Sequence, residues 1–544
     1  MDASTRFDTQ RVGALPVVGY FCDLLQLGET VDRVVPWEGE VPLGVLVEIL
    51  VINRLLQPKA MFRIGKWAHT AGVTDYFNLT ADQLNDDRLG RVLERVADHR
   101  ETIEGSLVLG IIRRFKLDVS QVHYDISDVE LFGAYELDVP EGQPAPTPMP
   151  AYGRTKSGRK NVKQIQFGLN VTGDGAVPLA HLPLDGNAAE SPTHLANLKQ
   201  LARILPKQEL LYIADSKLDT PENLRTVVAA HGQFLCAGVF SPKLQQEFLK
   251  RRHKLRRVEY FPKTQAKRSP DERDRYEAVE ITEQLEGTVD GRTLKCDYRL
   301  IFVWSQARAR DQATTRERHV AKIRAAFEAV EKNLGRYSLK TREAIMRRLE
   351  AARAKYSEGT LFAYELTERR GKFTLSWKID PKLLAEWEHL EGVYVLKTNL
   401  SKRTYPIAKL LETYGDQKHV ERRIHHLKGP LAIAPMFLEN PKRIAGLLCI
   451  LVWALLVLAL MERQVRRRLR GKPMYGLYPE NRPSPAPTGP ALLDCFSTLC
   501  MVIIKHHGHV TRRLADPTDT QREILKLLDI DSARLQTFKR RCGM

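Results

Sequence analysis

The amino-acid sequence predicts an α/β protein in which helices pack against a mixed sheet. Residues 119–126 (VSQVHYDI) alternate between apolar and polar side chains, a period of two that is typical of a strand. Residues 165–171 alternate in the same way, and Gly-Asp-Gly at 173–175 turns the chain into AVPLAHLPL, which predicts a β-hairpin. The short apolar run 210–214 (LLYIA) predicts a further, buried strand. Strands and helices in this order favour an α/β layer.

Two proline-containing dipeptides predict where the helices between these strands begin. Ser191 followed by Pro192, and Thr220 followed by Pro221, each place proline at the first helical position behind an N-cap residue. Each dipeptide therefore predicts a helix start. The run QFLCAG at 233–238 predicts another strand after the second helix.

The remaining segments differ in composition and in the pattern of their apolar residues, and these differences predict the domain organisation. Residues 1–116 read as a helical domain, either one that binds DNA and dimerises or a plain helical domain. Residues 117–240 hold the first part of the α/β core, and 241–400 read as an α+β insertion with a charged helical region near 315–356. Residues 401–472 return to core helices, and 473–544 read as a Pro-rich linker with a small helical end.

Composition limits the kind of partner and the compartment. The formal net charge of +18 favours a polyanion, either a nucleic acid or an acidic membrane surface. The seven cysteines include no C-x-x-C pair, a pattern that fits a reducing cytosol. The first residues (MDASTRFDTQRVG) lack an apolar stretch, so a signal peptide is not expected.

One apolar segment leaves two interpretations open. Residues 444–461 are 18 consecutive apolar or small residues, and a helix of that length is roughly 27 Å long, marginally enough to cross a bilayer. Both flanks are basic, so they give no preferred orientation. The segment is either a membrane span or the central helix of a large soluble core. The catalytic pattern described next favours the second interpretation.

Two aspartates follow or end predicted strands and are candidate metal ligands. Asp125 lies near the end of the strand predicted at 119–126, and Asp215 follows the strand predicted at 210–214. Carboxylates at strand ends of an α/β sheet can meet in one crevice. Mg²⁺ prefers such oxygen ligands, and paired metal ions are a common means of phosphodiester cleavage. An aspartate after a strand is also a common turn former, so each residue alone is ambiguous.

A third carboxylate lies in a patterned helical segment. The spacing of Tyr414, Gln417, Glu421 and Lys428 would place all four on one stripe of a single helix that stops at Gly429-Pro430. This stripe suits metal and phosphate binding. The alternative is the solvated face of an amphipathic helix.

These segments together resemble the transposases of bacterial insertion sequences that have an RNase H-like catalytic core. The resemblance is carried by YDIS at Asp125, LYIADSK at Asp215, LEGVYVLKTN, and YGDQKHVERRIHHLKGPL around Glu421. The resemblance is more specific to one group of these transposases, in which the helix with the third carboxylate reads Tyr-x2-Arg-x3-Glu-x6-Lys. In this chain Gln417 stands at the position of the Arg. The basic loop GRTKSGRKNVKQ, the segment DGNAAES and the apolar helix with its exit LMERQVRRRL also resemble that family.

The resemblance implies an RNase H-like fold and cut-and-paste DNA transposition. Asp125, Asp215 and Glu421 would hold two Mg²⁺ ions, for which Mn²⁺ would substitute. DNA contacts would come from a set of polar and basic residues: Tyr414, Gln417, Lys428, Arg422, Lys156, Arg159 and Lys160. The partners would be double-stranded DNA, as terminal inverted repeats and target, and a second copy of the chain. No membrane partner is expected, and the location would be the bacterial cytoplasm at the nucleoid. The rival hypothesis is a transposase-derived DNA-binding protein without catalysis.

Three weaker patterns offer other sites. Cys495, Cys500, His506 and His509 are a possible zinc set, although their spacing is irregular and the stretch reads as helix. Trp377 and Trp387 would either stack on a flipped base or pack in a core. The basic runs at 250–257 and 463–472 are either solvated faces or DNA contacts.

Overall fold

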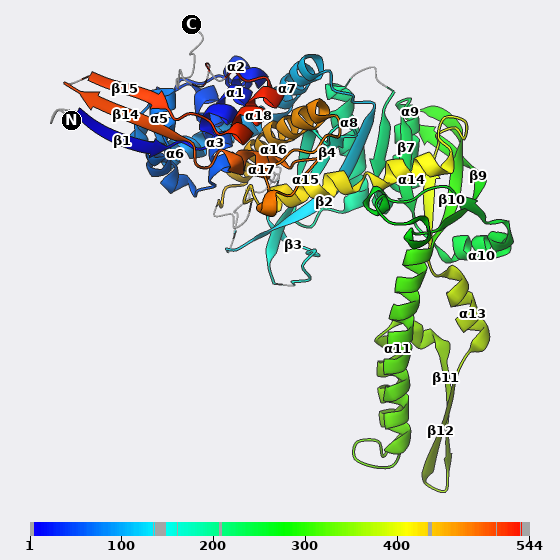
Figure 1. Ribbon diagram of the computed structural model, residues 1–544. Helices are drawn as coiled ribbons and strands as arrows, with labels where there is room; N and C mark the ends of the chain where they lie inside the picture. The colour runs from blue at the N-terminus through cyan, green and yellow to red at the C-terminus, as the bar shows by residue number, and fades with distance from the viewer. Residues whose placement is uncertain are drawn as a thin grey trace. The chain divides into compact units, whose positions relative to one another are not determined.

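A computed structural model describes residues 5–133, 135, 148–159, 161–205, 209–433, 438–507, 509–531, 533 and 535 (Figure 1). The chain forms two compact units: Met1–Gln233 with Asp416–Met544, and Phe234–Gly415. The predicted α/β class is confirmed in its coarse form, because helices and a mixed sheet are both present. The second unit contains more residues than the predicted insertion at 241–400, because it extends beyond it at both ends.

The first unit contains the mixed part of the sheet. Strand β4 (Lys163–Thr172) pairs antiparallel with β2 (Gln121–Leu131), β3 (Ala151–Tyr152) and β5 (Pro178–Leu184), and β2 pairs parallel with β6 (Leu211–Ala214). The predicted hairpin and the strand before Asp215 are therefore confirmed. The N-cap at Thr220 is confirmed too, since its side chain accepts a hydrogen bond from the backbone N–H of Asn223 at 3.2 Å.

Helices of the first unit surround these strands (Figure 1). The N-terminal series is α1 (Leu15–Leu25), α2 (Leu27–Val34), α3 (Leu43–Leu56), α4 (Ile64–Thr70), α5 (Val73–Phe77), α6 (Asp86–Asp98) and α7 (Arg100–Phe115). The others are α8 (Glu190–Ile204), α9 (Pro221–Ala229), α15 (Lys418–Lys428), α16 (Pro441–Leu469), α17 (Gly489–Cys495) and α18 (Asp519–Leu528).

A small sheet pairs a strand near the N-terminus with strands near the C-terminus, and it contradicts two predictions. Strand β1 (Thr5–Arg11) pairs antiparallel with β14 (Cys500–His506), which pairs with β15 (His509–Leu514). The N-terminal segment is therefore not wholly helical, and the segment expected to be a helix near Cys500 is a strand. Strand β1 is mostly exposed, and both strands are short, so their pairing across the chain leaves little periodic signal in the sequence.

Helix α16 is the core of the first unit. Its most apolar window is completely buried by protein, and it packs against α3, α6 and β5. A Cβ at Gly446 would collide with the carbonyl oxygen of Leu93, so glycine permits the close approach of α16 to α6. Among the described residues this is the one helix long and apolar enough to cross a membrane. A central core helix can be as long and as apolar as a membrane span, and the burial of α16 is that of a core helix.

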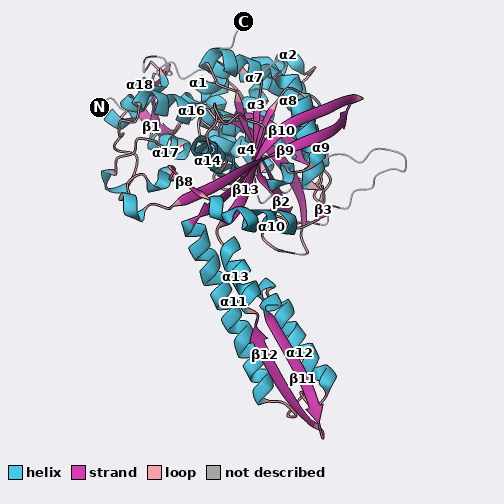
Figure 2. Cartoon of the chain, turned by 90° about the vertical axis from the view of Figure 1, so that its right-hand side faces the viewer, coloured by secondary structure: helices cyan, strands magenta, loops and turns pink. Residues whose placement is uncertain are grey.

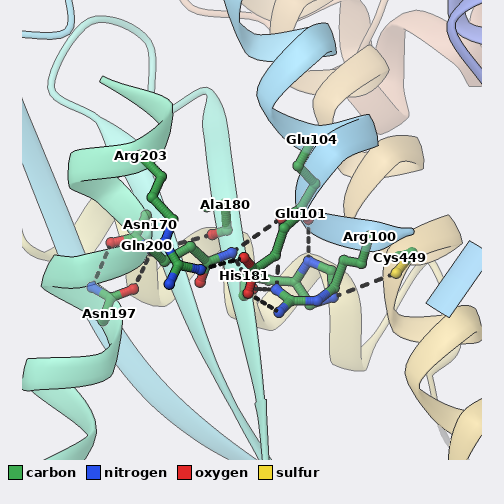
Figure 3. Close-up of polar contacts among 10 residues, drawn as sticks. All are labelled: Arg100, Glu101, Glu104, Asn170, Ala180, His181, Asn197, Gln200, Arg203 and Cys449. Atoms are coloured by element: carbon green, nitrogen blue, oxygen red, sulfur yellow. Dashed lines mark hydrogen bonds and ion pairs between the residues drawn. The ribbon is translucent and has the colours of Figure 1, made fainter. Parts of the chain in front are cut away.

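A buried polar network fastens α7 to the sheet (Figure 3). The Glu104 carboxylate on α7 contacts the His181 Nδ1 of β5, and Gln200 of α8 donates to Glu104 at 3.3 Å. Arg100 lies 3.7 Å from the same carboxylate, and the Cys449 sulfur of α16 lies 3.8 Å from the His181 Nε2. Side chains from α7, β5 and α8 thus surround the buried Glu104 carboxylate, as a buried ion requires, and Cys449 of α16 contacts the far side of the His181 ring.

The second unit has an antiparallel sheet. Its strand order is β7 (Gln233–Gly238), β13 (Val393–Thr398), β10 (Arg292–Ser305), β9 (Tyr276–Val289) and β8 (Arg256–Val258). Its other elements are α10 (Pro242–Arg251), α11 (Gln306–Lys332), α12 (Arg342–Ala354), α13 (Pro381–Leu390), α14 (Ile407–Gly415) and the hairpin β11 (Phe362–Arg369) with β12 (Lys372–Ile379). The predicted strands at 360–366, 373–377 and 392–399 are confirmed.

Helices α11 and α12 pack beside the β11–β12 hairpin around a small apolar core (Figure 2). Trp377 packs against it with its ring 5.8 Å from that of Phe327 and 6.0 Å from that of Phe362, and Trp387 packs on the same cluster. The Trp377 indole N–H donates to Glu331 at 3.2 Å. Both tryptophans therefore have packing roles, and stacking on a flipped base is not supported.

Candidate active site

Asp125 lies in the middle of β2 rather than near its end. The prediction ended this strand at Ile126, but pairing with β4 continues to Leu131. The strand extends because the sequence after Asp125 (ISDVEL) keeps its residues mostly buried between neighbouring strands. Asp125 itself is half-buried and pairs with Leu169 of β4.

Asp215 follows β6, as predicted, and stands level with Asp125. The parallel register pairs His123 with Ile213, and two further residues along each strand bring Asp125 beside Asp215. Asp215 caps a short 3-10 helix, and its carboxylate accepts a hydrogen bond from the backbone N–H of Lys217 at 2.9 Å. The sheet therefore brings together two carboxylates that are far apart in the chain.

Both carboxylates line one cavity of about 290 Å³. A third carboxylate, Glu190, also lines it, and Glu190 forms an ion pair with Lys217 at 3.0 Å. Sequence reasoning missed Glu190 because it placed the N-cap of the helix at Ser191, whereas α8 begins at Glu190 with Ala189 as N-cap. The acidic residue before Ser-Pro was the available signal, since carboxylates are favoured in a first helical turn.

Burial and mutual repulsion act on the two aspartates. Burial is the largest cause that raises the pKa of Asp125 to about 6, and the charges of Asp215 and Glu421 raise it further while Lys156 lowers it. Burial also raises the pKa of Asp215, and the charge of Glu190 adds to this effect. Carboxylates so arranged disfavour one another's ionisation, and a bound cation relieves that repulsion.

A layer of aromatic and polar side chains supports the cavity from behind. His194 lines the cavity, and its Nδ1 lies 3.1 Å from the hydroxyl of Tyr212. Asn197 donates to the same hydroxyl at 2.9 Å, and the rings of Tyr124 and Tyr212 stack with centroids 6.0 Å apart. Burial lowers the pKa of His194 to about 4, so its ring is neutral at neutral pH.

Glu421 lies on α15, on the solvent-exposed side of the site. Its side chain is exposed, and it does not line the cavity, although its charge raises the pKa of Asp125. Among the residues that the structure describes, no three His, Cys, Asp or Glu side chains stand close enough to hold one metal ion together. Asp125 and Asp215 thus line one cavity together, whereas Glu421 lies near that cavity but does not line it.

The predicted single helix from Tyr414 to Lys428 is two helices. Helix α14 ends at Gly415, two residues form a turn, and α15 begins at Lys418, so Tyr414 shares no helical stripe with Glu421. Glycine and aspartate at 415–416 favour a break over a continuous helix. The predicted stop at Gly429 is confirmed, as it follows the last residue of α15.

Gln417 is buried and does not face solvent. Its side-chain oxygen lies 3.0 Å from the Nδ1 of His123, and its amide nitrogen donates to the backbone carbonyl of Tyr124 at 2.8 Å. The side chain is only 7% exposed. Its predicted role as a DNA contact is therefore wrong: it joins the start of α15 to β2, next to Asp125.

We expect Gln417→Ala to lower the free energy of unfolding by about 1–3 kcal/mol, because it leaves His123 and the Tyr124 carbonyl without a buried partner. Urea unfolding monitored by circular dichroism measures this loss. Lys418→Ala, one residue along and half-buried without a side-chain hydrogen bond in the described chain, is the control. Equal stability of the two variants would contradict the bridging role.

Lys428 is engaged by a carboxylate that the sequence analysis did not single out. Its Nζ lies 2.9 Å from the Oδ1 of Asp128, and the backbone N–H of Lys156 donates to the other oxygen at 3.0 Å. Burial alone would raise the pKa of Asp128, but these contacts outweigh it and the pKa is lowered. The pair ties the end of α15 to β2 and the basic loop.

The other predicted DNA contacts fall into three groups. Lys156 lines the cavity, and its Nζ donates to the carbonyl of Ile126 at 2.7 Å. Arg159 is exposed and forms an ion pair with Glu130 at 3.0 Å, while Arg422 is exposed on α15. Lys160 lies outside the described residues.

The possible zinc set does not form a site. Cys495 ends α17, Cys500 and His506 lie on β14, and His509 lies on β15. All four are described, and none belongs to a group of three potential ligands within the described chain. The ring of His506 instead bonds the Thr5 hydroxyl at 2.8 Å.

Comparison with known families covers a different part of the chain. A family model described as a domain of unknown function (DUF4277) matches residues 7–103. This segment includes most of β1 and the helices up to the start of α7, and it ends before Asp125. No curated protein matches the chain.

Proposed function

We propose that this chain is a bacterial DNA transposase that cuts DNA at the ends of a mobile element and joins them to target DNA. The observation that carries the proposal is the cavity that Asp125 and Asp215 share on neighbouring parallel strands. The charge of Glu421 reaches the same site, because it raises the pKa of Asp125. Of the three carboxylates singled out from the sequence, Asp215 and Glu421 are thus close enough for their charges to raise the pKa of Asp125.

We further propose that the first-unit sheet is an RNase H-like core. Three antiparallel strands, β2, β4 and β5, are followed through α8 by β6, which lies parallel to β2. The order supports the proposal because it places Asp125 on β2 and Asp215 directly after the adjacent parallel strand β6. The positive net charge and the arginine-rich helices support DNA as the partner. Active complexes are proposed to contain two copies of the chain, located at the nucleoid in the cytoplasm.

The ion proposed is Mg²⁺, with Mn²⁺ as substitute, because the candidate ligands are carboxylates. Asp125, Asp215 and Glu421 would hold the ions, and carboxylate oxygens are the ligands that Mg²⁺ prefers. When bound, two such ions activate the attacking oxygen and stabilise the leaving oxygen of a phosphodiester. Burial is the largest cause of the raised pKa values of the two aspartates, and the charges of neighbouring carboxylates add to it. A divalent cation would offset that repulsion. Lys156 keeps the loop at the cavity through its bond to the Ile126 carbonyl.

The test uses the full chain and duplex oligonucleotides that carry inverted repeats found on either side of the reading frame. We expect nicks with free 3′-hydroxyl ends at the repeat boundary in Mg²⁺ or Mn²⁺, and strand transfer into a plasmid. Ca²⁺ should support binding without cleavage. Specific binding with no cleavage in any divalent metal would favour the rival, a transposase-derived DNA-binding protein. Absence of both binding and cleavage would overturn the proposal.

A further inference from the structure

Three cations line the cavity that holds Asp125 and Asp215. Lys217 is paired with Glu190 at 3.0 Å, and the Nζ of Lys156 is held by the carbonyl of Ile126 at 2.7 Å. The third, Arg154, is exposed at the cavity and makes no ion pair or side-chain hydrogen bond with any residue that the structure describes. Among the described cations that line the cavity, its guanidinium is therefore the one free to receive a ligand.

The backbone that carries Arg154 is anchored on both sides. Before it, Tyr152 ends β3, which pairs with Lys163 of β4. After it, the hydroxyl of buried Thr155 donates to the carbonyl of Arg159 at 2.9 Å, and the backbone N–H of Lys156 donates to Asp128 at 3.0 Å. A fixed backbone with an unengaged side chain suits a group that binds a ligand at a defined place.

The chemistry of the cavity selects the ligand. A guanidinium presents a planar fork of donors that matches two oxygens of a phosphate, and it stays charged at all working pH values. The carboxylates beside it repel a bare phosphate, so the ligand that fits is a phosphodiester that approaches the site together with divalent cations. A volume of about 290 Å³ admits one such group and not a duplex.

We propose that Arg154 binds the non-bridging oxygens of the phosphodiester that is cut, and so selects where the DNA strand enters the site. This inference rests on the proposed transposase function and adds a substrate contact to it. Arg154 was not among the residues that the sequence pattern singled out, because neither periodicity nor motif spacing distinguishes it from its basic neighbours in the loop.

The test compares Arg154→Ala and Arg154→Lys with Arg203→Ala, a control outside the cavity and outside the predicted DNA contacts, whose exposed arginine is already paired with Glu101. Binding of the end oligonucleotide is measured by fluorescence anisotropy in Ca²⁺, and cleavage in Mg²⁺. We expect Arg154→Ala to lose about tenfold or more in affinity and in cleavage rate, Arg154→Lys to lose less, and Arg203→Ala to change little. Thermal unfolding of Arg154→Ala should match that of the native chain.

A second arm identifies the phosphate. Replacing the scissile phosphate by an uncharged methylphosphonate should weaken binding by the native chain, and should weaken binding by Arg154→Ala far less, because the contact is already lost. Additive losses, or native-like cleavage by Arg154→Ala, would overturn the assignment while the proposed function stands. A native chain that neither binds nor cuts these ends would overturn both.

Discussion

Asp125→Asn is expected to reduce DNA cleavage by a factor of roughly 10³ or more, while affinity for the element ends in Ca²⁺ stays within a few fold. The asparagine keeps the size of the side chain but loses the charge that would hold a divalent cation beside Asp215. Single-turnover cleavage of an end oligonucleotide measures the rate, and anisotropy measures binding. Asp98→Asn, an exposed aspartate paired with Lys442 at 2.9 Å, is the control. Cleavage at a native rate by Asp125→Asn would remove this residue from the site.

The same substitution should stabilise the metal-free chain at neutral and higher pH. Folding raises the pKa of Asp125 from 3.8 to about 6, chiefly through burial. The folded state therefore holds the proton more tightly, and this contribution to stability is full below about pH 4 and is lost as the pH rises through about 6. Asparagine has no charge to bury, so its advantage well above pH 6 is about 3 kcal/mol.

Urea unfolding in EDTA at pH 5 and pH 8 checks this sign. The native chain should lose stability relative to Asp125→Asn between the two pH values, and Mg²⁺ should stabilise the native chain but not the variant. A variant less stable than the native chain at pH 8 would show that burial of the carboxylate carries no such cost. Because it needs no DNA, this measurement separates loss of charge from loss of fold.

The second large effect is expected at the ion pair between α15 and α16. Arg423 and Glu462 are 2% and 1% exposed and lie 2.7 Å apart. Arg423 also donates to the backbone carbonyls of Ala176 and Gly175 at 2.9 and 3.0 Å. Burial lowers the pKa of Arg423, but the Glu462 carboxylate opposes that shift, and each charge depends on the other.

Arg423→Met should lower the free energy of unfolding by about 3–5 kcal/mol, because it leaves the Glu462 carboxylate buried without its main partner. Adding Glu462→Gln should recover part of this loss, since the uncompensated charge is then gone. Denaturant midpoints of the two single variants and the double variant measure the coupling. Additive losses would show that the two side chains do not stabilise α15 through one another.

The parts of the fold that the sequence could predict are those governed by local pattern. The alternation before Asp125, the Gly-Asp-Gly hairpin and the Thr220-Pro221 cap depend on residues close together in the chain. Strand β1 could not be predicted, because its partner β14 lies near the other end of the chain. The break at Gly415–Gln417 was missed because the side-chain spacing continues across it, although the backbone does not.

The same distinction applies to the site. Asp125 and Asp215 were found because each belongs to a strand pattern, and the parallel register then brings them together. Glu190 and Arg154 join the site through a helix start and a loop, whose placement depends on tertiary contacts. Asp128 lies on β2 itself, but its role depends on contacts with the distant Lys428 and Lys156. The partner of Gln417 is a buried histidine distant in the chain, so its burial could not be read from its own surroundings.

Helix α16 has a consequence for the order in which the chain can fold during synthesis. Helices α3 and α6 and strand β5 pack against it, yet the ribosome produces them long before residue 441. The apolar side chains of the first unit that contact α16 therefore stay uncovered while the whole second unit is translated. Asp125 and Asp215 leave the ribosome early, but the helix with Glu421 arrives only just before that cover. A chain released before α16 is complete would thus be a fragment that aggregates.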